Sequence, residues 1–229
     1  MKVKVLGIVG TPIRNGNCQY IVEVALKAAE ETEGVETELI HLSDYNIKYC
    51  IGCDKCMRTV AKKQKELGMI WADWAPVPVE GYTCSIKDDM QILHEKMVEA
   101  DGFIIGAPVY MVSVPGQLKT FVDRCRTFAH DLRLIGKVLG AVTVGYFRHA
   151  GEENTIHTIN NFGYTMFMNV VAEGASTIST KEGTGVPIKD PKIAVKEDTY
   201  GLYWVRQMGI RVGHMAKIVK AGREITGLV

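Results

Sequence analysis

Residues 2–17 read KVKVLGIVGTPIRNGN, and this stretch decides the fold. The run from Lys2 to Gly10 is rich in β-branched and other apolar residues, which indicates a strand. Apolar residues then recur with helical spacing between Gln19 and Glu33, and Gly34 ends that helix. A strand followed at once by a helix is typical of βαβ units, so the stretch predicts a parallel sheet.

Four further strands and four further helices continue this alternation. The strands are expected at Val35 to Leu42, Gly102 to Ala107, Lys137 to Gly145 and Asn169 to Gly174. The helices are expected at about residues 88–100, 116–129, 152–166 and 199–222. Five parallel strands with right-handed crossovers match the doubly wound α/β order 2-1-3-4-5. Ligands of such sheets bind at the carboxyl ends of the strands, near the switch point between strands 1 and 3.

Composition predicts one domain spanning residues 1–229. The chain has 47% hydrophobic residues and no composition break. Its 27 basic and 26 acidic residues nearly cancel, so the charge balance predicts neither a nucleic-acid partner nor an anionic membrane surface. Met1 leads directly into a strand, and no run approaches the roughly 20 apolar residues of a membrane span. We therefore expect a soluble, cytoplasmic protein.

Cysteines supply the strongest chemical signal. Four of them form one motif: Cys50, Cys53 and Cys56 in the run YCIGCDKC, and Cys84 shortly before the acidic pair at 88–89. Two-residue spacings bring successive thiolates around one small inorganic centre, and iron–sulfur sites commonly take a fourth ligand from far away in sequence. A structural zinc site and an empty, reduced thiol cluster remain alternatives. Cys18 and Cys125 are expected to be buried small hydrophobes.

The cysteine motif brackets an insertion after the second strand, at residues 50–84. Within it, residues 57–83 begin with a basic stretch that predicts a helix and continue as an extended arm with two tryptophans, Trp71 and Trp74. Residues 176–198 are polar and rich in glycine and lysine, which predicts a long surface loop before the last helix.

The turn after the first strand has the character of a phosphate loop. A glycine-bearing turn at a helix N-terminus offers unpaired backbone amides and the positive end of the helix dipole to an anion. Thr11 and Asn17 add side-chain donors, and Arg14 adds a full charge. The turn lacks the two-glycine dinucleotide fingerprint and the Gly-Lys-Ser/Thr of triphosphate loops, so it favours a monophosphate. An ordinary βα turn is the alternative.

Two more loops are expected at the same edge of the sheet. The third strand ends in Ala107-Pro108 and continues with aromatic and apolar residues suited to the wall of a flat heterocycle. The fourth strand ends in GYFRHAGE at residues 145–152. If strands 1, 3 and 4 are neighbours, the phosphate loop and these two segments converge.

These three loops and the cysteines resemble those of the iron–sulfur flavoproteins, within the NADPH-dependent FMN reductase group of flavodoxin-like proteins. GTPIRNGN resembles the FMN phosphate loop, APVYMVSVPGQLK the segment that holds the isoalloxazine and ribityl, and VGYFRHAGEEN the third flavin loop. The resemblance covers nearly the whole chain. It implies bound FMN, with phosphate-loop residues Thr11, Arg14, Asn15, Gly16 and Asn17, ring contacts Pro108, Val109, Tyr110 and Met111, and third-loop residues Gly145, Tyr146, Arg148, His149 and Gly151.

The resemblance also implies a [4Fe–4S] cluster on Cys50, Cys53, Cys56 and Cys84. In the family the fourth cysteine follows the third by only a few residues, whereas 27 residues intervene here. A loop can be extruded while its ends stay together, because about two doublings of loop length cost only on the order of 1 kcal/mol. The insertion is therefore compatible with a four-cysteine cluster.

The functional expectation is a flavin-dependent oxidoreductase that passes electrons between a reduced donor, ferredoxin or NAD(P)H, and an acceptor. The reactive group is the flavin, so no catalytic side chain is predicted. The resemblance further implies a homodimer or homotetramer, with one chain's cluster near another chain's FMN. Two alternatives are a cluster-free NAD(P)H-dependent FMN or quinone reductase and a non-enzymatic flavodoxin-like interaction module. The chain carries no separate nucleotide fingerprint.

Overall fold

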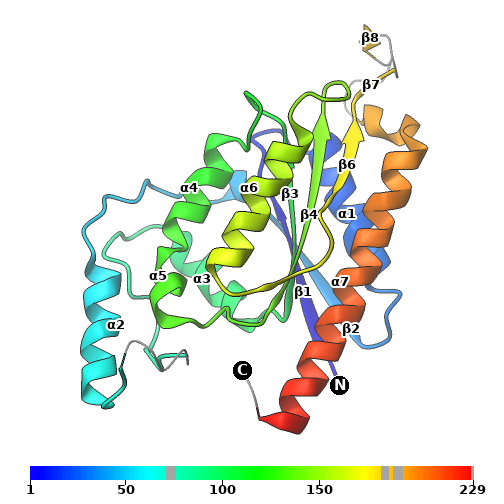
Figure 1. The fold of residues 1–229 in the computed structure, drawn as a ribbon. Coiled ribbons are helices and arrows are strands. Elements are labelled where there is room, and N and C mark those ends of the chain that lie inside the picture. Colours follow the sequence, from blue (N-terminus) through cyan, green and yellow to red (C-terminus); the bar gives the residue numbers. More distant parts are fainter. Residues whose placement is uncertain (71–75, 182–185, 188–192, 228–229) are drawn as a thin grey trace.

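The computed structural model describes residues 1–70, 76–181, 186–187 and 193–227. Its main sheet is parallel and has the order β2-β1-β3-β4, after which β5 and β6 both pair with β4 (Figure 1). The strands are β1 (Val3–Val9), β2 (Val35–His41), β3 (Gly102–Pro108), β4 (Val138–Gly145), β5 (Asn169–Val170) and β6 (Ala175–Ile178). The predicted doubly wound order 2-1-3-4-5 is confirmed, with one strand more than expected.

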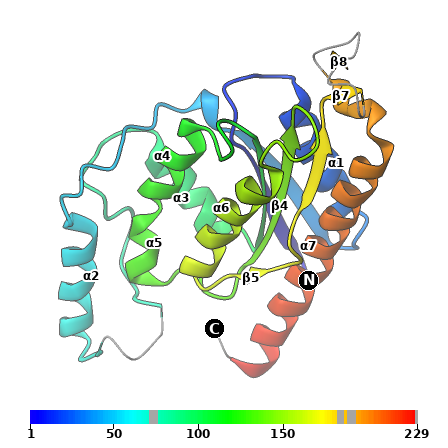
Figure 2. The same cartoon turned by 45° about the horizontal axis from the view of Figure 1, so that its top comes forward.

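Helices cover both faces of this sheet (Figures 1 and 2). They are α1 (Asn17–Ala29) and α7 (Thr199–Thr226) on one face, and α3 (Met90–Glu99), α4 (Gly116–Arg124) and α6 (Glu152–Thr165) on the other. The central strands β3 and β4 are buried almost throughout, which explains their uninterrupted apolar runs. Gly209 lets α7 approach α1, since a Cβ there would lie 2.0 Å from the carbonyl oxygen of Ala25. No helix in the described part of the chain is long and apolar enough to cross a bilayer.

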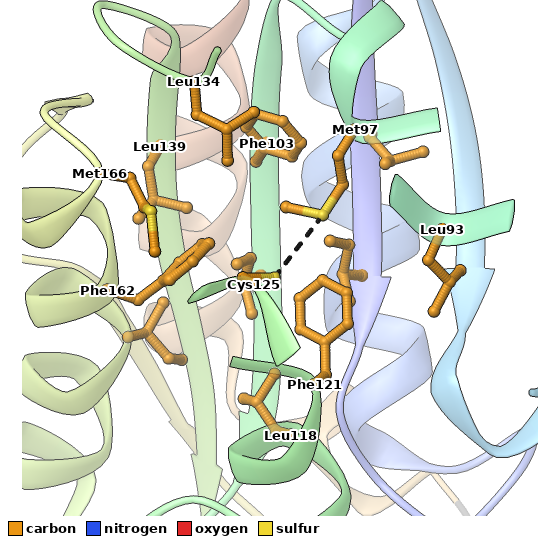
Figure 3. Close-up of a cluster of buried hydrophobic side chains, with 14 of the residues drawn as sticks. Leu93, Met97, Phe103, Leu118, Phe121, Cys125, Leu134, Leu139, Phe162 and Met166 are labelled. Atoms are coloured by element: carbon orange, nitrogen blue, oxygen red, sulfur yellow. Dashed lines mark hydrogen bonds between the residues drawn. The ribbon is translucent and has the colours of Figure 1, made fainter. Parts of the chain in front are cut away.

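The core beneath α3, α4 and α6 is closely packed (Figure 3). Met97, Phe103 and Phe121 meet there, each at most 1% exposed. Cys125 is 0% exposed, and its Sγ lies 3.9 Å from the Sδ of Met97. Cys18 is 4% exposed in the core on the other face. The expected burial of both cysteines is confirmed.

The prediction of one strand at residues 169–174 is wrong. The chain forms β5, leaves the sheet, and re-enters it as β6. Ala172 and Gly174 have positive φ values of 58° and 152°, which extended strands do not adopt, and these two residues separate the two short strands.

The single helix predicted over residues 116–129 is also wrong. Helix α4 ends at Arg124, Cys125 interrupts it, and the chain continues as a second helix, α5 (Arg126–Asp131).

The loop expected at residues 176–198 contains regular structure. Its described parts hold β6, the paired strands β7 (Thr180–Lys181) and β8 (Val186–Pro187), and the 3-10 helix η3 (Ala194–Glu197). Residues 182–185 and 188–192 of this loop lie outside the described residues.

The insertion after β2 contains the predicted helix, α2 (Lys55–Glu66). It stands beside α5, outside the layers that cover the sheet (Figures 1 and 2). Val60 is its one buried residue. The returning arm joins the body where the Val77 amide donates to the Asp131 carbonyl at 2.9 Å. The tryptophans of the predicted arm, at 71 and 74, lie outside the described residues.

The buried side chain of His94 is expected to make the stability of the fold sensitive to acid. It is 1% exposed, stacks on Phe128 with ring centroids 4.3 Å apart, and has a pKa lowered to about 3 by burial and by the charge of Arg133. An unfolded histidine titrates near about 6.5. Between these two values the unfolded chain binds a proton that the folded chain does not, so stability falls as pH falls through this window.

We expect His94→Gln to make unfolding less dependent on acid. At about pH 5 the neutral, buried imidazole costs the wild type about 2 kcal/mol of unfolding free energy relative to pH 7.5. Urea unfolding of both proteins at the two pH values measures the difference. Equal losses in wild type and variant would contradict the buried, neutral state of this histidine.

Candidate functional site

A cavity of about 530 Å³ opens at the carboxyl ends of β1, β3 and β4. The residues predicted as cofactor contacts that line it are Thr11, Arg14, Asn15, Gly16, Asn17, Pro108, Val109, Tyr110, Gly145 and Tyr146. Lining residues that the sequence did not predict as cofactor contacts are Ile13, Cys18, Val144 and Ser179. Three loops far apart in sequence therefore meet at the edge that the strand order predicts.

The β1–α1 loop ends in a helix N-terminus that lacks a side-chain cap. Gly16 is the N-cap residue of α1, no side chain bonds the first amides, and the first turn holds no acidic residue. Thr11 is 2% exposed and its Oγ1 accepts from the Ile13 amide at 3.3 Å. Uncapped amides at the positive end of a helix suit an anion, so this loop fits a phosphate group.

Two of the predicted phosphate-binding side chains also contact other parts of the protein. The side-chain oxygen of Asn17 accepts from the Val195 amide at 3.2 Å, and this bond does not use Nδ2, the side-chain donor for a phosphate. Arg14 forms an ion pair with Asp44 of the 3-10 helix η1 (Leu42–Asp44), and both side chains are partly exposed. This pairing orients the guanidinium beside the loop without burying its charge.

The β3–α4 loop turns sharply beside the cavity. Tyr110 and Ser113 exchange two backbone hydrogen bonds of 2.8 and 3.0 Å, and the two residues between them, Met111 and Val112, have φ values of 48° and 63°. A positive φ is a true outlier for β-branched valine. The turn is held by Asn154, whose Nδ2 donates to the Val112 carbonyl at 2.6 Å. It leaves Tyr110 at the cavity and Met111 96% exposed.

The β4–α6 loop divides between two hollows. Gly145 and Tyr146 line the main cavity, and Ser179 joins them because its amide donates to the Gly145 carbonyl at 2.9 Å. Arg148 and His149 line a separate hollow of about 430 Å³. Met111 and Gly151 line neither hollow. Flavin contacts by the predicted residues, inside the main cavity or outside it, stay predictions.

The cysteine motif is partly assembled. Cys50 and Cys53 are exposed, whereas Cys56 and Cys84 are half-buried. The Sγ of Cys53 lies 3.1 Å from the Oγ of Ser85, next to Cys84 in the chain. The two ends of the insertion therefore meet, as the motif requires.

Local electrostatics differ between the thiols. Hydrogen bonds from Ser85 and from the Lys55 amide lower the pKa of Cys53. Burial raises the pKa of Cys56. A hydrogen bond from the Met57 amide, in the first turn of α2, acts in the opposite direction but is weaker than the effect of burial. Among the described residues, no three His, Cys, Asp or Glu side chains converge as they do around a single metal ion. Four cysteine thiols are nevertheless the donor set of an iron–sulfur cluster, so the residues fit that group by their chemistry.

A buried ion pair lies behind Cys84. Arg124, at the end of α4, donates to the two carboxylate oxygens of Asp88 at 2.5 and 3.0 Å, and the two side chains are 1% and 0% exposed. The same guanidinium donates to the Lys48 carbonyl at 2.7 Å, the Tyr82 hydroxyl at 2.7 Å and the Cys84 Sγ at 3.7 Å. Burial acts to raise the pKa of Asp88, but the Arg124 bonds outweigh it and hold that pKa low. Sequence patterns did not indicate Arg124.

Comparisons with known proteins agree with this geometry. A family model described as NADPH-dependent FMN reductase matches residues 3–183. An iron–sulfur flavoprotein of Methanocaldococcus jannaschii is 39% identical over 218 residues, which cover 95% of this chain and 100% of that protein. An iron–sulfur flavoprotein of Methanosarcina thermophila is 29% identical over 97% of this chain and 100% of its own length.

A solved structure shares the fold. RosB with its bound intermediate 8-demethyl-8-formylriboflavin-5'-phosphate superposes with a TM-score of 0.69 at 19% identity, covering 96% of this chain and 81% of that chain. The likeness supports a flavodoxin-like arrangement of strands and helices.

Proposed function

The chain belongs to the NADPH-dependent FMN reductase family and, within it, to the iron–sulfur flavoproteins, and from this premise we propose that it is a two-centre electron carrier. It is a flavin-dependent oxidoreductase. In the proposal FMN binds in the 530 Å³ cavity, and Cys50, Cys53, Cys56 and Cys84 hold a [4Fe–4S] cluster. Electrons then pass between a reduced donor, ferredoxin or NAD(P)H, and an acceptor.

One observation carries the flavin half of the proposal. Three loops meet around a single cavity that has uncapped helix amides at one end and Pro108, Val109 and Tyr110 along a wall. The amides suit a phosphate, and the apolar and aromatic wall suits a flat ring. These residues bind and orient the cofactor and exclude water from one side of it. When bound, FMN supplies two-electron and one-electron chemistry, and a cluster supplies one-electron chemistry.

The cysteine half rests on the contact between Cys53 and Ser85, the residue after Cys84, which brings the two ends of the insertion together. Next to them, Tyr49 and Ile51 are 79% and 69% exposed. Exposed apolar side chains beside partly exposed thiols suit a covered protein contact. We therefore propose that the cysteine site lies at a subunit contact of a homodimer or homotetramer. Sedimentation or light scattering of Ile51→Asp against wild type tests this contact, and an unchanged mass would contradict it.

The decisive test is the content of iron, acid-labile sulfide, zinc and FMN per chain in protein purified without oxygen. We expect about four irons, about four sulfides and one FMN. FMN with zinc, or with no metal, would assign the cysteines a structural role and leave a cluster-free NAD(P)H-dependent reductase. Protein without FMN at saturating FMN would contradict the flavin site.

Helix α2 offers a surface for an acidic electron-transfer partner. It carries five basic residues and one acidic residue, and it projects from the body. Opposite charges steer protein encounters, and salt screens the attraction. We propose a ferredoxin-like protein as the partner.

Reversing two of these charges is expected to slow electron transfer. Lys62→Glu combined with Lys65→Glu should lower the rate of flavin reduction by a reduced acidic ferredoxin several-fold at low salt, and the difference should shrink above about 0.5 M salt. Stopped-flow absorbance measures the rate. The control is Lys27→Glu combined with Lys196→Glu, which changes the net charge equally on other elements. Equal rates for the two double variants would exclude α2 as the docking surface.

A further inference from the structure

The insertion poses a physical problem for the cysteine site. Cys56 and Cys84 are separated by 27 residues, so something besides a short connection must bring them together. Helix α2 contributes little packing, because Val60 is its one buried residue. The buried contacts that join the two ends lie instead at one side chain, Arg124.

Arg124 bonds to both sides of the insertion at once. On the near side, its Nη1 donates to the carbonyl of Lys48, two residues before Cys50. On the far side, its Nη2 donates to the Tyr82 hydroxyl and to the Sγ of Cys84 itself. Asp88 completes the link, since it accepts from the guanidinium and also from the Lys48 amide at 2.8 Å.

The chemistry of these contacts requires arginine. Five acceptor atoms from four residues, on the two sides of the insertion, surround a planar fork, and a lysine amine has one nitrogen with which to reach them. The pair is almost fully buried, so a missing donor would leave buried acceptors without partners. A buried ion pair is also directional, which suits it to fixing a position more than to adding net stability.

We propose that Arg124 is the positioning residue of the four-cysteine site, holding Cys84 in register with the Cys50–Cys56 segment across the insertion. This role rests on the proposed function. Arg124 acts through the backbone of Lys48 and through Cys84, and it is not itself a ligand. Its N–H donation to the Cys84 sulfur also favours the more negative, reduced state of a cluster bound there.

The first test is iron retention. Wild type, Arg124→Lys and Tyr82→Phe, each purified without oxygen, are exposed to a ferrous chelator while FMN and iron are followed separately. Loss of a supporting bond around a metal ligand typically weakens metal binding about 10- to 100-fold, so Arg124→Lys should release iron at least about tenfold faster with FMN retained. Tyr82→Phe, which removes one of the bonds, should fall between the two.

Lys137→Met is the matched control for general loss of stability. Lys137 is a buried cation, 8% exposed, that donates to the carbonyls of Val98 and Ala100, and the described structure shows no contact between it and the cysteine motif. Equal iron release in Lys137→Met and Arg124→Lys would overturn the positioning role. Iron release from Arg124→Lys at the wild-type rate would overturn it too.

Two further readouts test this role, and the second of them does not depend on a bound cluster. The cluster that does assemble in Arg124→Lys should have a more negative midpoint potential than in wild type, which a merely structural change would not predict. In iron-free full-length protein, a short thiol-to-thiol cross-linker should join peptide 50–56 to Cys84 in wild type and Lys137→Met, but several-fold less in Arg124→Lys. Wild type without iron would refute the cluster, and undiminished cross-linking in Arg124→Lys would refute the positioning role by itself.

Discussion

Cys53→Ser is expected to remove nearly all iron and sulfide from the protein while FMN stays bound. Cys53 is exposed, and hydrogen bonds from Ser85 and the Lys55 amide already lower the pKa of its thiol, which favours the thiolate that binds iron. A serine hydroxyl keeps the size of the side chain but is far less acidic and a poorer iron ligand. Iron should fall from about four per chain to near zero, because a cluster with three protein ligands here has an exposed corner.

The control for this variant is Cys125→Ala. It removes a thiol that is 0% exposed and packs on Met97, and it leaves the side chain of the neighbouring Arg124 unchanged. That variant should lose some stability and keep its iron. Iron, sulfide and FMN are quantified in both variants after purification without oxygen. Full iron in Cys53→Ser would remove Cys53 from the ligand set, and loss of FMN together with iron would mean that the variant has unfolded.

The parts of the fold that the sequence predicted are those in which one physical signal dominates. β3 and β4 are covered on both faces, so their apolar runs are unmistakable. β6 was missed because only the backbone turn at Ala172 and Gly174 separates it from β5, and its own sequence, ASTI, is half polar. With β6 unpredicted, Ser179 at its end was missed as a lining residue of the cavity.

The predicted residues that the structure brings to the main cavity are those placed by position along a strand, and the residues that it places elsewhere depend on loop conformation. Thr11, Pro108 and Gly145 follow strand ends, so the strand order places them at one edge. In the third loop, His149 and Gly151 have positive φ values of 60° and 109°, and Arg148 and His149 line the second hollow instead. Nothing in a single sequence reports that a histidine adopts a left-handed conformation.

Arg124 shows a second limit of sequence reasoning. A basic residue in the last turn of a helix is normally exposed and favoured there by the helix dipole. Here it is 2% exposed, because Asp88, 36 residues away, supplies a buried counter-charge. Such pairing depends on the distance between two chain segments in space, which hydrophobic periodicity does not encode.

FMN is expected to bind at least about 100-fold more tightly than riboflavin. The two ligands differ only in the phosphate, and the β1–α1 loop presents uncapped amides at the start of α1 together with Thr11 and Arg14. Each hydrogen bond to a charged group contributes about 1.5–3 kcal/mol, and about 1.4 kcal/mol is a tenfold change in affinity. Two such bonds therefore give a ratio of about 100 or more. Titration of flavin-free protein, followed by quenching of flavin fluorescence, measures both affinities.

Arg14→Gln should lower this FMN-to-riboflavin ratio about tenfold by weakening FMN binding, with riboflavin affinity nearly unchanged. Because Arg14 is paired with Asp44, the variant also breaks an ion pair, and Asp44→Asn separates the two effects. Asp44→Asn breaks the same pair but keeps the guanidinium, so its ratio should stay at or above the wild-type value. A ratio near one in the wild type would refute the phosphate loop. Equal losses of selectivity in both variants would mean that the ion pair shapes the loop and that the arginine charge does not reach the phosphate.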